Sequence, residues 1–241
     1  MAVKPVRLNA AIAWLFIIGS ALFVLGSVPA YVNAVGSTVD SITYFVGSIF
    51  FTAASFSQLV QAQTPAMTEV DADSQYRPAP VRVKAWLPHD RNWLAAITQF
   101  PGTLFFNIST FAALLHNLTV KQQDRRIWRP DFYGSTLFLV ASVFAILAIG
   151  RFLSFRPRSL PWWIAWLTMI GSILFMASAL ASFVLPMTGE FINSEISLAG
   201  TLLGAACFLL GAILMFPAWK SAVRAAEPLH PEDPQHQRSS K

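Results

Sequence analysis

Hydrophobic and polar positions fall into long blocks along this chain. The apolar blocks are six stretches near 11–33, 42–62, 93–118, 132–153, 161–188 and 196–219. Each is close to or above the roughly 20 residues that a helix needs to cross about 30 Å of hydrocarbon. A backbone in lipid must satisfy its own hydrogen bonds, so we expect every stretch to be helical. A β-barrel would need strands of about ten residues with alternating polarity, and these stretches are far longer and apolar throughout. The pattern predicts an all-α polytopic membrane protein with six transmembrane helices.

Composition agrees with this prediction. Of the 241 residues, 55% are hydrophobic and only 12% are charged, whereas a soluble domain carries about 25% charged residues. Most charges lie between the apolar stretches or at the chain ends. The net charge of +5 follows from basic residues gathered on the cytoplasmic side of a membrane. It therefore requires no nucleic-acid partner.

The distribution of basic residues predicts the orientation, because cytoplasmic loops are enriched in lysine and arginine. Basic residues occupy the N-terminus, the 63–92 loop, the 154–160 connection and the C-terminal tail. We expect both termini to be cytoplasmic and the protein to lie in the inner (cytoplasmic) membrane. One loop disagrees, since residues 119–131 are basic and would lie outside. Two re-entrant segments at the third and fourth stretches would remove that conflict, and we keep six spans as the leading interpretation.

A short motif recurs in every stretch: a glycine, then serine or threonine, then an apolar run that usually contains phenylalanine. The glycines are Gly19, Gly47, Gly102, Gly134, Gly171 and Gly200; the last copy, Gly200-Thr201, lacks the phenylalanine. Small residues let helices approach closely. Since the motif recurs six times, we interpret these glycines as helix-packing notches, in preference to the lining of a substrate path.

The position of the motif within its stretch alternates from one stretch to the next. This alternation predicts that the repeated unit is a helical hairpin. The expected divisions are an N-terminal hairpin (1–62), a cytoplasmic loop (63–92), a middle hairpin (93–153), a C-terminal hairpin (154–219) and a disordered cytoplasmic tail (220–241).

The first hairpin resembles the YrhK-like family of small bacterial membrane proteins. The resemblance rests on Trp14, on the run Gly19-Ser20-Ala21-Leu22-Phe23, and on Phe45-Val46-Gly47-Ser48. Trp166 and Gly171-Ser172-Ile173-Leu174-Phe175 repeat it in the last hairpin. It covers about half of the chain, which is about three hairpin units long. The resemblance implies a membrane hairpin fold and transfers no activity, catalytic residue or cofactor.

No catalytic or metal-binding motif is present, and we expect a protein that is not an enzyme and carries no cofactor. The most reactive-looking cluster is His89-Asp90-Arg91. We interpret it as an interfacial anchor, with Asp90 as a helix N-cap.

Two candidate sites remain. Uncharged polar residues Gln58, Gln99 and Asn107 predict a polar cavity, or alternatively hydrogen bonds between helices. Arg125, Arg126 and Arg129 are candidate contacts for anionic lipid headgroups, or a charged stop between spans. We expect a non-enzymatic protein that acts through membrane lipids, a second copy of itself or another membrane protein. The alternative is a facilitator or transporter of a small neutral or amphipathic solute.

Overall fold

Six long helices form the body of the protein in the computed structural model, which describes residues 2–64, 77–115, 117–151 and 155–226. The long helices are α1 (Pro5–Gly26), α3 (Ser37–Ala62), α6 (Arg91–Ala112), α8 (Arg129–Ile149), α9 (Leu160–Ala181) and α10 (Ser194–Ala226). The short elements are α2 (Pro29–Val35), α7 (Val120–Gln123), the π-helical turn η1 (Asp124–Trp128), and strands β1 (Ala2–Val3) and β2 (Ala79–Pro80). β1 and β2 pair antiparallel, which ties the N-terminus to the segment before α6.

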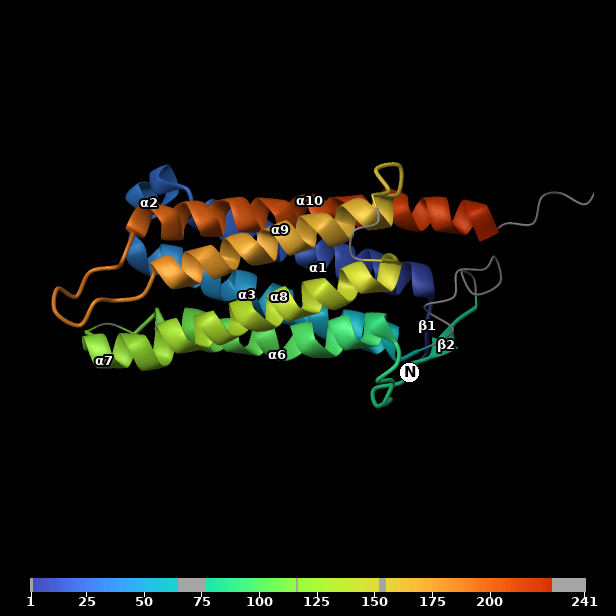
Figure 1. The fold of residues 1–241 in the computed structure, drawn as a ribbon, viewed down its shortest axis with the longest axis horizontal. Coiled ribbons are helices and arrows are strands. Elements are labelled where there is room, and N and C mark those ends of the chain that lie inside the picture. Colours follow the sequence, from blue (N-terminus) through green and yellow to red (C-terminus); the bar gives the residue numbers. More distant parts are fainter. Residues whose placement is uncertain (1, 65–76, 116, 152–154, 227–241) are drawn as a thin grey trace, which may run out of the picture.

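The long helices close into a ring. Each packs against the next along the chain, and α10 packs against α1 (Figure 1). The most extensive contacts are those between α1 and α3, between α6 and α8, and between α9 and α10. One end of the bundle, called the terminal end below, holds the start of α1, the end of α10 and the β1–β2 pair. The far end holds α2, α7 and the connection between α9 and α10.

Five of the helices are long and apolar enough to cross a membrane: α1, α3, the continuous segment from α7 through α8, α9 and α10. Their number indicates a membrane-embedded, all-helical protein. The sixth long helix, α6, falls outside this set. Its polar residues Gln99, Thr103 and Ser109 are buried inside the bundle, whereas Ile108 and Phe111 on its outer face are more than half exposed.

The helix boundaries differ from the predicted ones at both ends of the chain. The first helix runs from Pro5 to Gly26 and a short separate helix starts at Pro29, because proline has no N–H to continue the α1 ladder but fits the first turn of a new helix. The last helix continues to Ala226, so residues 220–226 are helical; the rest of the predicted disordered tail lies outside the described residues.

The two middle helices, α6 and α8, are each continuous over their length. α6 and α8 lie side by side along the length of the bundle (Figure 1), and their 22 and 21 residues correspond to about 30 Å each at 1.5 Å per residue.

Candidate functional site

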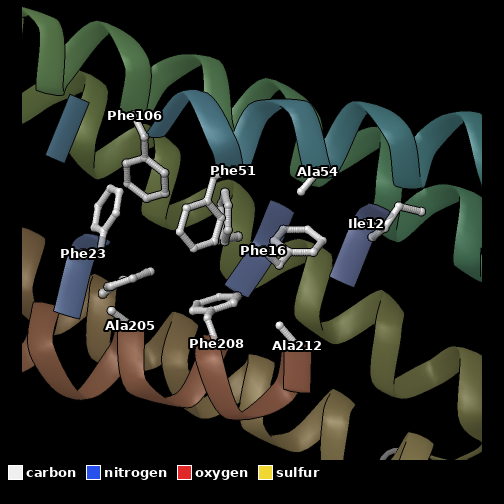
Figure 2. Packing of buried hydrophobic residues seen from close by; sticks show 11 residues of the cluster. Ile12, Phe16, Phe23, Phe51, Ala54, Phe106, Ala205, Phe208 and Ala212 are labelled. Carbon is white, nitrogen blue, oxygen red and sulfur yellow. The ribbon is translucent and has the colours of Figure 1, made fainter. Parts of the chain in front are cut away.

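A cluster of six phenylalanines occupies the centre of the bundle, one from each long helix: Phe23, Phe51, Phe106, Phe138, Phe175 and Phe208. All six are at most 8% exposed. Figure 2 shows Phe23, Phe51, Phe106 and Phe208 converging on one another from different helices. Aromatic rings favour centroid separations of about 4.5–7 Å, and the measured separations between neighbouring rings fall in that range.

The rings lie in pairs that follow consecutive helices. The centroids are 5.4 Å apart for Phe23 and Phe51, and 5.1 Å apart for Phe106 and Phe138. Phe175 and Phe208 are stacked at 5.2 Å. The rings from α3, α8 and α10 also contact one another, with centroid separations of 5.6 to 6.4 Å. The six rings therefore form one continuous layer across the bundle.

Each phenylalanine packs into a glycine of the partner helix. A Cβ added at Gly47 would lie 2.8 Å from the Phe23 ring and 3.2 Å from the Gly19 carbonyl oxygen. One added at Gly134 would lie 3.0 Å from the Phe106 ring and 3.1 Å from the Gly102 oxygen. These contacts are at or below the closest approach usual for a Cβ atom, so a side chain at either position requires the facing ring or helix to shift. Five of the predicted packing notches lie in this layer: Gly19, Gly47, Gly102, Gly134 and Gly171.

The sixth glycine of the layer is Gly204, one helical turn after the expected Gly200. A Cβ at Gly204 would meet the Phe175 ring at 2.7 Å and the Gly171 oxygen at 3.0 Å. Gly200 also lies close to a neighbouring helix, but its contact is with the backbone of α9. A Cβ added at Gly200 would lie 2.8 Å from the Leu174 carbonyl oxygen. The pattern shared by all six helices is thus glycine with phenylalanine four residues later, which a helix places on one face.

A cavity of about 370 Å³ lies between this phenylalanine layer and the terminal end of the bundle. All six long helices contribute to its wall. Phe16 and Phe208 line its inner part, whereas Ala62 at the end of α3 and Pro161 at the start of α9 line its outer part. The cavity is therefore blind, reaching the terminal end and closed toward the far end by aromatic rings. Its volume lies within the range of small-molecule sites, about 300–1,000 Å³.

The polar groups of the cavity are uncharged. They are Asn9 on α1, Gln58 on α3, Asn92 and Gln99 on α6, Thr168 on α9 and Trp219 on α10. No aspartate, glutamate, lysine, arginine or histidine is among the residues that line it. Alanines and larger apolar side chains make up the rest of the wall, so the cavity offers amide hydrogen-bond donors and acceptors on an apolar surface.

Two of the three predicted cavity residues, Gln58 and Gln99, line this space. Within the described part of the chain neither side chain forms a hydrogen bond, and the Gln58 Oε1 atom is buried without a donor. A buried amide oxygen without a partner costs about 1–3 kcal/mol. An unpaired acceptor at the cavity wall is the arrangement expected where a bound molecule supplies the hydrogen bond.

Asn107, the third predicted cavity residue, lies elsewhere. Its Nδ2 atom donates to Thr52 Oγ1 at 2.8 Å, across the contact between α6 and α3. A turn further along the same contact, the hydroxyls of Ser48 and Thr110 lie 2.9 Å apart. The expectation of hydrogen bonds between helices therefore holds for Asn107, and the expectation of a cavity holds for Gln58 and Gln99.

The His89-Asp90-Arg91 cluster has the arrangement of a helix start. Asp90 Oδ1 accepts hydrogen bonds from the backbone N–H groups of Asn92 and Trp93, at 2.8 and 3.3 Å, which confirms it as the N-cap of α6. The Arg91 side chain donates to the Leu147 carbonyl oxygen at the end of α8. The carboxylate and the guanidinium are thus both engaged in holding helix ends.

The predicted lipid-contacting arginines lie in or next to the π-helical turn η1 at the far end. Arg125 and Arg126 are exposed. Arg129 instead forms an ion pair with Asp124, at 2.9 Å.

Within the described ranges, no group of three or more histidine, cysteine, aspartate or glutamate side chains could hold a metal ion. The chain matches no protein-family model, no curated protein and no solved structure.

Proposed function

We propose that the protein is a six-span membrane protein built from three hairpin repeats, α1–α3, α6–α8 and α9–α10. The inclusion of α6 is supported by its apolar outer face and by its position between α3 and α8 in the ring. The repeat is supported by the glycine–phenylalanine pairs, which have the same contacts in each hairpin. On the basis of this hairpin motif, we also propose that the protein is related to the YrhK-like family.

The proposed orientation places the terminal end in the cytoplasm. Eleven described basic residues belong to that end: Lys4, Arg7, Arg77, Arg82, Lys84, Arg91, Arg151, Arg156, Arg158, Lys220 and Arg224. Four belong to the far end: Lys121, Arg125, Arg126 and Arg129. By the positive-inside rule, the end with the excess of basic residues faces the cytoplasm, and a smaller number of basic residues can lie outside. The basic segment 119–131 is then compatible with an external position.

A labelling experiment tests this orientation. In a Cys207→Ser background, Arg126→Cys is expected to react with a membrane-impermeant maleimide added to intact cells, because η1 would face outward. Arg158→Cys, at the opposite end, is the matched control and is expected to react only after permeabilisation. Reaction of Arg126→Cys only after permeabilisation would contradict the six-span arrangement.

We further propose that the protein binds a small neutral or amphipathic solute in the cavity and is not an enzyme. One observation carries this proposal: the cavity is large enough for a small molecule, and its only polar groups are uncharged. A charged ligand would lose its hydration there without an opposite charge to compensate it. An uncharged ligand with hydrogen-bonding groups would satisfy Gln58 and Gln99 and bury its apolar part against the alanine-rich wall.

The phenylalanine layer favours binding over free conduction. A solute passing through the bundle would have to separate rings whose centroids lie 5.1 to 6.4 Å apart. The proposed state is therefore a chamber that loads from the cytoplasmic side, and transport would require a second conformation in which the layer opens.

The binding proposal is tested by extracting the purified protein from nanodiscs and identifying small molecules by mass spectrometry. We expect a molecule retained by the wild type to be lost, by at least about tenfold, in a Gln58→Leu/Gln99→Leu variant. Two hydrogen bonds at about 1 kcal/mol each correspond to such a loss. Gln61→Leu, also on α3 but outside the cavity, is the matched control and should retain the molecule. Identical extracts from the wild type and the double variant would refute the proposal.

A further inference from the structure

A second hollow, called the α1–α10 groove below, lies on the outside of the ring at the terminal end. It has a volume of about 330 Å³ and is lined by Val6, Asn9, Ala10, Phe216, Trp219, Lys220, Val223 and Arg224. The lining joins the first turns of α1 to the last turns of α10. Apart from Asn9 and the two basic residues, the wall is apolar or aromatic. The groove therefore combines a hydrocarbon surface with a basic rim.

The two basic residues lie on one face of α10, four residues apart, as a helix requires for neighbouring side chains. Both are exposed, and within the described ranges neither forms an ion pair. The only described acidic residue at this end of the bundle is Asp90, whose carboxylate caps α6. Two adjacent cations thus face the groove, and no acidic side chain of the described residues pairs with them.

The length of α10 places this rim at the level of lipid headgroups. Its 33 residues correspond to about 50 Å at 1.5 Å per residue, against a hydrocarbon thickness of about 30 Å. The surplus lies at the terminal end, where α10 extends past the other helices (Figure 1). Phe216 lies one turn further toward the bundle centre, where its ring contacts Trp14 with a centroid separation of 5.7 Å. Because α1 and α10 run antiparallel, Ala10 lies near the level of Lys220 and Val6 near that of Arg224. Val223 is only 6% exposed, so α10 stays packed against its neighbours up to this level.

We propose that the α1–α10 groove binds one anionic phospholipid of the cytoplasmic leaflet. Its phosphate lies between Lys220 and Arg224, and an acyl chain lies against Ala10 and Phe216. Charge complementarity selects the anionic headgroup, and the apolar wall continuous with the rim selects a lipid over a free anion. The groove shares two wall residues, Asn9 and Trp219, with the central cavity, but the residues proposed to hold the phosphate, Lys220 and Arg224, line the groove alone.

Native mass spectrometry tests the proposal, with the full-length protein released from nanodiscs of equal parts phosphatidylglycerol and phosphatidylcholine. The wild type is expected to retain one phosphatidylglycerol in preference to phosphatidylcholine. Lys220→Gln/Arg224→Gln is expected to lower that preference by about tenfold or more, since each basic residue near the headgroups contributes to the attraction. The matched control Arg82→Gln/Lys84→Gln removes two exposed basic residues that do not line the groove and should retain the lipid.

A steric variant separates the groove from general attraction to charge. Ala10→Phe keeps both basic residues but fills the apolar wall, and it is expected to lower retention of phosphatidylglycerol by a similar factor. Full retention in Ala10→Phe or in Lys220→Gln/Arg224→Gln would overturn the proposal, as would an equal loss in the Arg82→Gln/Lys84→Gln control. Displacement of the lipid by added inorganic phosphate would also overturn it, because the site would then bind a free anion. An unchanged thermal unfolding midpoint establishes that each variant is folded.

Discussion

Gly204→Ala is expected to destabilise the protein by about 1–3 kcal/mol, the usual cost of forcing extra volume into a packed core. The new methyl group would lie 2.7 Å from the Phe175 ring and 3.0 Å from the Gly171 carbonyl oxygen. The ring can rotate away only into the phenylalanine layer, and the carbonyl belongs to the backbone of α9. The helices α9 and α10 must therefore separate. Unfolding by sodium dodecyl sulfate in mixed micelles measures the change in free energy.

Gly211→Ala is the matched control for this substitution. Gly211 is buried on the same helix, seven residues further on, but its nearest neighbours would lie 3.8 Å or more from an added Cβ. Alanine is favoured over glycine in a helix by up to about 1 kcal/mol, so the control should be neutral or slightly stabilising. A double-mutant cycle of Gly204→Ala with Phe175→Leu should show a favourable coupling energy, because the smaller side chain relieves the closest contact. Equal effects of the two alanine substitutions would contradict the packing described here.

Five members of the glycine layer follow from the sequence motif, and the sixth does not. The motif of glycine followed by serine or threonine selects Gly200-Thr201, and Gly200 does pack closely against α9 but lies one turn outside the layer. The structure requires only that the residue after the glycine be small: Ser20, Thr103 and Ala205 are each 0% exposed. Phenylalanine four residues after the glycine was the more informative signal, because the ring fills the partner notch. That spacing alone identifies Gly204 and Phe208.

The cavity was only partly predictable, because its wall is built from residues that looked unrelated along the chain. Asn9 precedes the first apolar stretch and Asn92 belongs to the predicted loop, so neither was considered. They reach the cavity because α1 and α6 begin earlier than the hydropathy indicated. Asn107 does not line the cavity, because it lies eight residues after Gln99, a rise of about 12 Å along α6. That rise carries it past the cavity to the level of the phenylalanine layer, which only the register between helices reveals.

Phe138→Ala is expected to destabilise the protein more than Gly204→Ala does. The side chain is 1% exposed, and its ring contacts those of Phe51, Phe106 and Phe208. Removing a buried phenylalanine costs about 3–5 kcal/mol in soluble proteins. In a membrane protein the transfer of the side chain from water contributes less to this cost, because the surrounding lipid is as apolar as the protein core. The loss of packing and the remaining void persist, so we expect a cost of about 2–4 kcal/mol.

A phenylalanine-to-alanine substitution at Phe111 tests whether this cost comes from the phenylalanine layer. Phe111 lies on the outer face of α6 and is 54% exposed, so Phe111→Ala should change the unfolding free energy by less than about 1 kcal/mol. Phe138→Leu should fall between the two, since leucine fills part of the void. All three are compared by the same detergent unfolding titration. A Phe138→Ala protein no less stable than Phe111→Ala would mean that the six rings do not hold the helices together. The position of Phe208, which lines the blind end of the cavity, would then depend on its contacts with Phe51 and Phe175 and not on the Phe138 ring.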